Sequence, residues 1–181
     1  SALLFAGEDG VAAVSIIMYL QFLCIGIYFG FSMGLSTPLG YAYGDRNFSV
    51  CRVLEKYAYR FFAIAPIILY GCTYLLAPIG VYFFASPGST VFDMAVSGLR
   101  LYGLGFLFSG INIFAAIRMM TYGKGYISGM ITFLRSFALL LLFLTVLPRF
   151  LELNGIWLAV PAAEILTLIV ALWTLRKKTV A

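Results

Sequence analysis

Long stretches without any charged residue dominate this sequence. Residues 11–44 and 61–92 contain no Asp, Glu, Lys or Arg, and three further apolar blocks follow near 97–121, 125–147 and 155–175. About 20 consecutive apolar residues in a helix cross a hydrocarbon core that is about 30 Å thick. Because a water-soluble domain has no use for so many apolar segments in succession, the pattern predicts a protein that crosses a lipid bilayer several times.

The composition agrees with a membrane protein. Hydrophobic residues make up 63% of the 181 residues and charged residues only 10%, whereas soluble domains carry about 25% charged residues. The sequence starts at Ser1, and neither a basic stretch nor a small-residue cleavage site precedes the first apolar segment. We therefore expect no signal peptide, and we interpret the chain as a piece of a longer polypeptide.

Metal and nucleophilic chemistry have little support in this sequence. It contains no His, and its three cysteines, Cys24, Cys51 and Cys72, lie in or beside apolar segments without C-x-x-C spacing. We therefore expect no metal site and no disulfide framework. Because no nucleophile–base pair is visible either, we expect no enzymatic activity and no cofactor other than a coupling ion.

The apolar segments predict helices rather than barrel strands. Backbone polar groups inside lipid must be satisfied within the protein, so a spanning segment is either a helix or part of a closed barrel. These segments are too long and too evenly apolar for barrel strands. We predict an all-α polytopic membrane helix bundle with five transmembrane helices. They are expected at about residues 9–44, 53–85, 91–122, 125–147 and 153–175.

Basic residues gather in alternate loops, which predicts the orientation in the membrane. One set of loops carries Arg46, Arg52, Lys56, Arg60, Arg118, Lys124, Arg176, Lys177 and Lys178, and the opposite set carries only Arg149. The positive-inside rule places the larger set in the cytoplasm, with the Ser1 end outside and the Ala181 end inside. Since the basic residues follow the loops and not one binding face, we expect no nucleic-acid partner.

Two charged residues are predicted to lie at the same depth in the membrane. Glu164 precedes Arg176 by 12 residues, which is roughly 18 Å from the basic end and close to the bilayer midplane. Arg135 follows Lys124 by 11 residues, roughly 16 Å from the same end. An unpaired charge at this depth is costly, so we expect the two to meet. They form either a structural ion pair or a proton- or cation-sensitive switch.

Other polar residues in the apolar segments are candidates for transport. Asp93 and Arg100 are seven residues apart on one face at the outer end of the third helix, where they are either solvated or functional. Aromatic rings and Met suit promiscuous apolar or cationic ligands, although such residues most often only pack. The candidates for the wall of a substrate cavity are Gln21, Tyr28, Met33, Tyr102 and Asn112.

Three segments resemble a known transporter family. Residues 38–47, PLGYAYGDRN, close a long helix and resemble the G-Y-x-Y-G-A-x-N segment of the multidrug and toxic compound extrusion (MATE) family. Residues 154–164, NGIWLAVPAAE, are similar to the start of that family's last helix, and residues 99–102, LRLY, resemble the outer end of its fourth repeat helix. Asp45 departs from the pattern, since Ala is commoner at its position.

The resemblance implies an architecture larger than this chain. The family fold has two six-helix lobes around a central cavity, and residues 1–181 would supply helices two to six of the C-terminal lobe. The partner would then be the missing N-terminal lobe of the same protein, which carries the coupling carboxylate of many members. A lipid bilayer would surround both lobes.

The resemblance also implies a function. It points to a multi-pass protein of the cell inner membrane that exports amphipathic organic cations by alternating access, driven by entry of Na⁺ or H⁺. Two alternatives stay open. One is a lipid-linked oligosaccharide flippase of the same superfamily, with which the intramembrane Arg100 and Arg135 are compatible, and the other is a membrane scaffold that transports nothing.

Overall fold

The computed structural model describes residues 2–176, and all regular structure in that range is helical. The predictions of an all-α bundle and of five spanning helices are confirmed. The helices long and apolar enough to cross a membrane are Gly7–Gly44, Phe48–Tyr82, Thr90–Thr121, Gly125–Val146 and Pro148–Arg176. Ser1, Lys177, Lys178 and Ala181, on which the predicted placement of the chain ends partly depends, lie outside the described residues.

Two of the five spans contain a change of helix type. The first two spans are formed by α1 (Ala2–Gly44) and α2 (Phe48–Tyr82), and the last by α7 (Pro148–Arg176). In the third span, the 3₁₀ turn η1 (Gly103–Gly105) joins α3 (Thr90–Tyr102) to α4 (Phe106–Thr121). In the fourth, the π-helical turn η2 (Leu134–Ala138) joins α5 (Gly125–Phe133) to α6 (Leu139–Val146).

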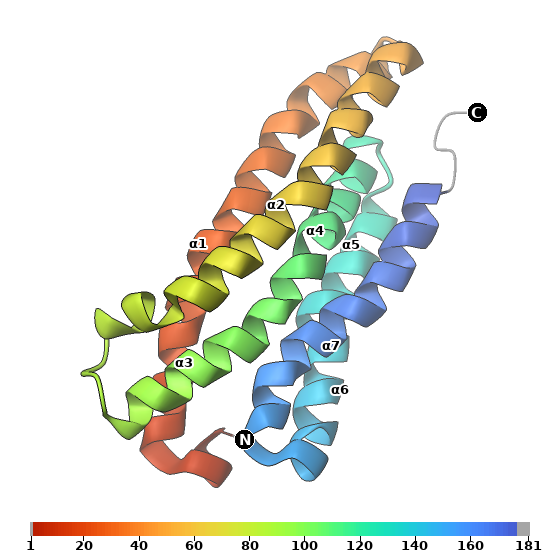
Figure 1. The fold of residues 1–181 in the computed structure, drawn as a ribbon. Coiled ribbons are helices and arrows are strands. Elements are labelled where there is room, and N and C mark those ends of the chain that lie inside the picture. The colour runs from red at the N-terminus through yellow and green to blue at the C-terminus, as the bar shows by residue number, and fades with distance from the viewer. Residues whose placement is uncertain (1, 177–181) are drawn as a thin grey trace.

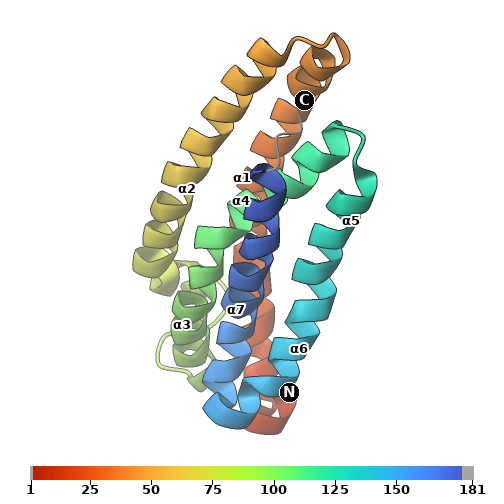
Figure 2. The ribbon, with the colours of Figure 1, turned by 90° about the vertical axis from the view of Figure 1, so that its right-hand side faces the viewer.

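The spans run alternately up and down, with α4 at the centre of the bundle. The α1–α2 and α4–α5 connections and the last residues of α7 lie at one end, which is the top of Figure 1 and which we call the basic end. The α1–α2 hairpin extends beyond the α4–α5 connection in both views (Figures 1 and 2). Helix α4 contacts α1, α2, α5 and α7, so its polar side chains lie among protein atoms and not in lipid.

Three helices begin at least five residues earlier than the sequence predicted. Helix α1 begins at Ala2 instead of residue 9, with a break in helical geometry at Gly7. Helix α2 begins at Phe48 instead of residue 53, because the side chain of Asn47 caps it by accepting a hydrogen bond from the Val50 amide at 3.3 Å. Helix α7 begins at Pro148 instead of residue 153. Pro is well tolerated in a first helical turn, and that turn joins the rest of α7 through a kink at Glu152, where φ is 49°.

Aromatic packing fills the middle of the bundle. Tyr28 of α1, Phe62 of α2 and Phe106 and Phe114 of α4 belong to one buried cluster. The Tyr28 hydroxyl donates a hydrogen bond to the backbone carbonyl of Phe106 at 2.9 Å. Because lipid tails are as apolar as these rings, close packing and hydrogen bonds such as this one, rather than escape from water, hold the helices together.

A charged cluster ties α2 to α4 near the basic end. The Arg118 guanidinium forms an ion pair with the Glu55 carboxylate, and the Tyr122 hydroxyl donates to the same carboxylate oxygen at 2.6 Å. Burial raises the pKa of the Tyr122 hydroxyl, and its bond to Glu55 raises it further, so this hydroxyl remains a donor at neutral pH. Arg118 and Tyr122 thus both hold Glu55 through its Oε1 atom.

Replacement of Gly155 by Ala is predicted to destabilise the protein. A Cβ atom at Gly155 would lie 2.5 Å from the carbonyl carbon and oxygen of Leu147. These are backbone atoms that cannot swing aside, so overpacking of about 1–3 kcal/mol or more is expected. Gly129→Ala is the matched control, because nothing lies within 4 Å of its added Cβ.

The measurement is the thermal unfolding midpoint of the full-length protein in detergent. Gly155→Ala lowers the midpoint by several degrees, and Gly129→Ala leaves it unchanged or raises it, because Ala favours a helix over Gly. Equal midpoints for the two variants would contradict the close approach of α7 to the α6–α7 turn.

Candidate functional site

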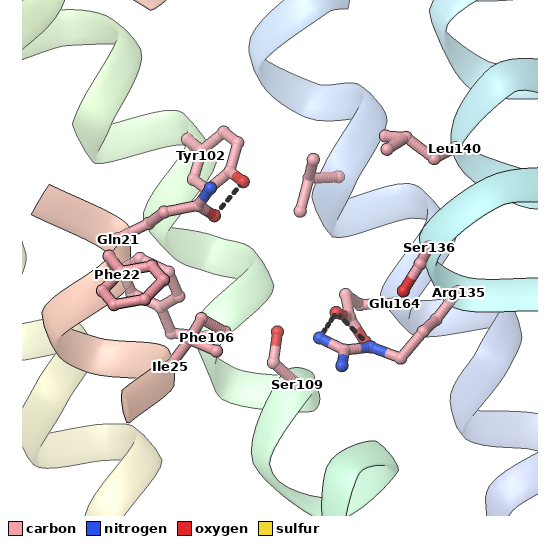
Figure 3. A pocket seen from close by; sticks show the side chains of 11 residues that line it. Gln21, Phe22, Ile25, Tyr102, Phe106, Ser109, Arg135, Ser136, Leu140 and Glu164 are labelled. Carbon is pink, nitrogen blue, oxygen red and sulfur yellow. Dashed lines mark hydrogen bonds and ion pairs between the residues drawn. The ribbon is translucent and has the colours of Figure 1, made fainter. Parts of the chain in front are cut away.

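A polar groove opens between α1 and the η2–α6 segment. Helices α4 and α7 form its floor, and its volume is about 290 Å³. Figure 3 shows the side chains that line it. They are Gln21, Phe22, Ile25, Tyr102, Phe106, Ser109, Arg135, Ser136, Leu140, Val160 and Glu164.

The ion pair expected from the sequence lies in this groove. The Nη2 and Nε atoms of Arg135 donate to Oε1 of Glu164 at 2.7 and 3.1 Å. The Glu164 side chain is 5% exposed and that of Arg135 is 13% exposed, so the guanidinium is the member that faces the groove more openly (Figure 3). The structure thus brings the two residues together, while their depth in the membrane and their role in transport stay predictions.

Asn112 of α4 is the third member of the cluster. Its Nδ2 atom donates to Oε2 of Glu164 at 2.7 Å and to the Glu164 backbone carbonyl at 2.9 Å. Asn112 is fully buried, so it approaches Glu164 from the floor of the groove and not from its opening. The carboxylate accepts hydrogen bonds from two helices at once, one oxygen towards α4 and the other towards Arg135.

A π-helical turn presents Arg135 to the groove. Arg135 and the groove residue Ser136 both belong to η2, none of whose five residues is buried. Such turns carry an i→i+5 hydrogen bond, and they occur frequently at functional positions of helices. Arg135 thus belongs to a segment without buried residues, while its own side chain is 13% exposed and is bonded to Glu164. The composition of this segment is ordinary, so the sequence offered no signal for the turn.

Gln21 and Tyr102 form the opposite wall. The Tyr102 hydroxyl donates a hydrogen bond to Oε1 of Gln21 across the α1–α3 contact (Figure 3). The same two residues also border a second cavity of about 410 Å³, which is mainly apolar and extends past Ile17 and Trp157. The two cavities share Gln21, Tyr102, Leu140 and Val160. A ligand with a polar and an apolar part can therefore lie along both.

The structure places the remaining predicted residues away from the groove. Tyr28 is fully buried and bonded to the Phe106 carbonyl, so the expectation that it lines a cavity is corrected to a packing position. Met33 is 57% exposed on α1 and lines neither the polar groove nor the apolar cavity beside it.

Asp93 and Arg100 do not form an ion pair in the part of the chain that the structure describes. Asp93 is exposed in the first turn of α3, where a carboxylate is favoured by the helix dipole. The Arg100 guanidinium instead lies over the Tyr74 ring at 4.9 Å and donates to the Tyr74 carbonyl at 3.3 Å.

Two serines of the groove were missed by sequence reasoning. The Ser109 hydroxyl donates to the Gly105 carbonyl at 2.8 Å and borders the groove, and Ser136 borders it one residue after Arg135. Serine is unremarkable in a transmembrane helix because its hydroxyl can bond to its own backbone. These serines line the groove because of the side that α4 and η2 turn towards it. The sequence alone does not predict that orientation.

Comparison with known proteins identifies the fold. The family model for MatE matches residues 2–147. A multidrug resistance MATE family transporter of the MOP superfamily in an outward-facing conformation shares 23% identity, with a TM-score of 0.86. A MOP superfamily transporter from Pyrococcus furiosus, described as having a binding pocket of reverse polarity, shares 22% with a TM-score of 0.86. A MATE crystal structure in complex with MaL6 shares 22% with a TM-score of 0.87.

These structures are much longer than the chain. Each match covers 96% of residues 1–181 but only 39% or 40% of the solved transporter. No curated protein matches the chain. At this level of identity the likeness establishes the fold alone.

A cysteine at position 136 is predicted to react with water-soluble thiol reagents. Ser136 borders the polar groove, whereas the next residue, Phe137, is 55% exposed and lines neither this groove nor the apolar cavity beside it. Thiols react as thiolates, which form in water and not in hydrocarbon. We expect Ser136→Cys to react at least about tenfold faster than Phe137→Cys with a charged methanethiosulfonate.

The measurement uses full-length protein whose other cysteines have been replaced, reconstituted in vesicles. Protection of position 136 by a bound substrate would add support. Equal rates at the two positions would show that the groove is not a water-filled cavity.

Proposed function

Because the chain belongs to the MatE family, we propose that it forms part of an antiporter that exports amphipathic organic cations in exchange for Na⁺ or H⁺. The five spanning helices make it a multi-pass membrane protein. The proposed location is the cell inner membrane, with the basic end in the cytoplasm. The chain covers about 40% of the solved transporters, so the activity is proposed for the whole protein.

One observation carries the proposal: a carboxylate deep in the bundle borders a groove with an aromatic wall. Glu164 supplies the negative charge, and Phe22, Tyr102 and Phe106 supply ring surfaces on the opposite side. Aromatic faces attract organic cations, and an intramembrane carboxylate is a functional candidate by default. The adjoining apolar cavity suits the hydrophobic part of an amphipathic substrate.

The proposed mechanism is competition for Glu164. When no cation is bound, the Arg135 guanidinium occupies Oε1 of the carboxylate. A proton or Na⁺ that binds Glu164 displaces Arg135, and so does the charged group of a substrate. Since one carboxylate serves all of them, ion and substrate exclude each other, which is the requirement for exchange. Rocking of the two lobes then exposes the site to each side in turn.

The proposed partner is the rest of the same transporter. Gly26, Gly30 and Gly34 lie on the exposed side of α1, and nothing lies within 4 Å of a Cβ added at any of them. Small residues in membrane helices allow another helix to approach closely. The missing N-terminal lobe is the proposed occupant, and it would cover the groove to form the central cavity.

A flippase for lipid-linked oligosaccharides is the second candidate. The observation that favours it is Arg135, whose guanidinium is the more exposed member of the ion pair and borders the groove. A diphosphate would bind such a group by charge-assisted hydrogen bonds. In this case the substrate is anionic, and Arg135 rather than Glu164 contacts it.

Glu164→Gln is predicted to reduce coupled efflux by at least about tenfold while folded protein is retained, since Gln keeps the shape of the side chain and one oxygen that accepts from Arg135, but loses the charge and the second acceptor oxygen that faces Asn112. The measurement is ethidium efflux by full-length protein in vesicles under imposed Na⁺ or pH gradients. The control is Glu152→Gln on the same helix, where the carboxylate is exposed. Normal efflux by Glu164→Gln would refute the proposal, and loss of folded protein would assign the pair a structural role.

Tyr102→Phe is predicted to change substrate preference without loss of coupling. The change removes the hydroxyl that donates to Gln21 and leaves the ring in the wall. We expect KM values for different organic cations to shift unequally, by about 3–10-fold, because one hydrogen bond contributes about 0.5–1.5 kcal/mol. Tyr41→Phe, at an exposed position near the basic end, is the control. Uniform loss of transport for all substrates would contradict this assignment.

A further inference from the structure

We infer that one exposed face of α2 binds the anionic head groups of membrane phospholipids. Arg52, Lys56 and Arg60 follow one another at four-residue spacing in this helix, and all three are exposed. Residues spaced by four lie on one side of a helix, one turn apart. The three cations therefore form a ridge about 12 Å long at the basic end of the bundle.

The ridge points away from the protein. The side of α2 that packs against the bundle is marked by the buried residues Cys51, Ala58 and Phe62. At 100° per residue, Lys56 is turned about 140° from Cys51. The basic side chains are thus directed at whatever surrounds the bundle.

On the same face of α2, the residues that follow the ridge towards the membrane interior include three exposed isoleucines. Ile64, Ile67 and Ile68 are 60%, 67% and 57% exposed, as expected for side chains in contact with acyl chains. From Arg60 to Tyr82 the helix runs 22 residues, or about 33 Å, which is about the thickness of the hydrocarbon core. Arg60 therefore lies at the hydrocarbon boundary, and Lys56 and Arg52 lie about 6 and 12 Å farther out, in the head-group layer.

No acidic group of α2 neutralises the ridge. Glu55 is the one acidic residue in Phe48–Tyr82, and it is turned inward and bonded to Arg118 and Tyr122. Neither of the two ion pairs found among residues 2–176 includes a residue of the ridge. Asp45 lies before the helix, in the exposed α1–α2 connection. Three uncompensated positive charges beside acyl chains favour an anionic head group.

A lipid fits this face better than a free anion. The phosphate group of a phospholipid can contact the ridge while its acyl chains contact the isoleucines. Inorganic phosphate can contact only the ridge. Tyr57, 59% exposed beside the ridge, belongs to the residue types that favour the membrane–water interface. Basic residues next to a spanning helix attract anionic lipids, each by about fivefold near the surface.

The test is lipid retention by the full-length protein. Purified protein is equilibrated in nanodiscs of phosphatidylcholine and phosphatidylglycerol, and the co-purifying lipids are counted by native mass spectrometry. The triple variant Arg52→Gln, Lys56→Gln, Arg60→Gln is compared with the control Lys124→Gln, Arg149→Gln, Arg176→Gln, which removes three exposed charges that do not line up. A variant Arg52→Lys, Arg60→Lys keeps the charge of the ridge.

We expect wild type, the control and the lysine variant to retain phosphatidylglycerol over phosphatidylcholine, and the ridge variant to lose that preference by about a hundredfold. The preference should weaken at high salt. Unchanged preference in the ridge variant, or equal loss in the control, would overturn the inference. Displacement of phosphatidylglycerol by millimolar inorganic phosphate would show a free-anion site and would overturn the assignment to lipid.

Discussion

A carboxylate and a guanidinium in the middle of an apolar bundle must satisfy each other, and the arrangement of the last three spans follows from that need. Glu164 on α7 accepts from Arg135 on η2 and from Asn112 on α4. Removal of one member of a buried pair leaves an uncompensated charge, which typically costs about 3–5 kcal/mol. The register of the fourth and fifth spans relative to α4 is therefore set by three polar side chains.

The same cluster connects the fold to the proposed transport. The pair borders a groove and is not sealed in the core, and its cation belongs to a π-helical turn without buried residues. In the proposed exchange, opening of this pair would supply two states with different charge at one site. By contrast, the Glu55–Arg118–Tyr122 cluster lines neither the polar groove nor the apolar cavity beside it, and it joins α2 to α4.

The features that depend on charge placement and segment length were predicted from the sequence. Uncharged runs predicted five spans, and counting residues from the basic end predicted that Glu164 and Arg135 meet, because helical rise is constant. It was harder to predict whether a given side chain points into the core, into the groove or towards lipid. Tyr28 and Gln21 are both polar residues of α1, yet Tyr28 packs against Phe62 and Gln21 borders the groove. Apolar surroundings on all sides give no periodic signal that distinguishes lipid, groove and core.

Local details were missed for a related reason. The start of α2 depends on a cap by the Asn47 side chain, and the start of α7 depends on a kink at Glu152, and neither is visible in hydropathy. The π-helical turn that carries Arg135 and Ser136 likewise has no signal in the composition of its segment.

A double-mutant cycle tests the central ion pair most directly. The variants are Arg135→Met, Glu164→Met and the double substitution in the full-length protein, compared by free energy of unfolding. If the two charges stabilise each other, each single variant is less stable than wild type and the double variant is more stable than either single one, since two apolar side chains leave no buried charge. Free-energy losses that add in the double variant would contradict the account.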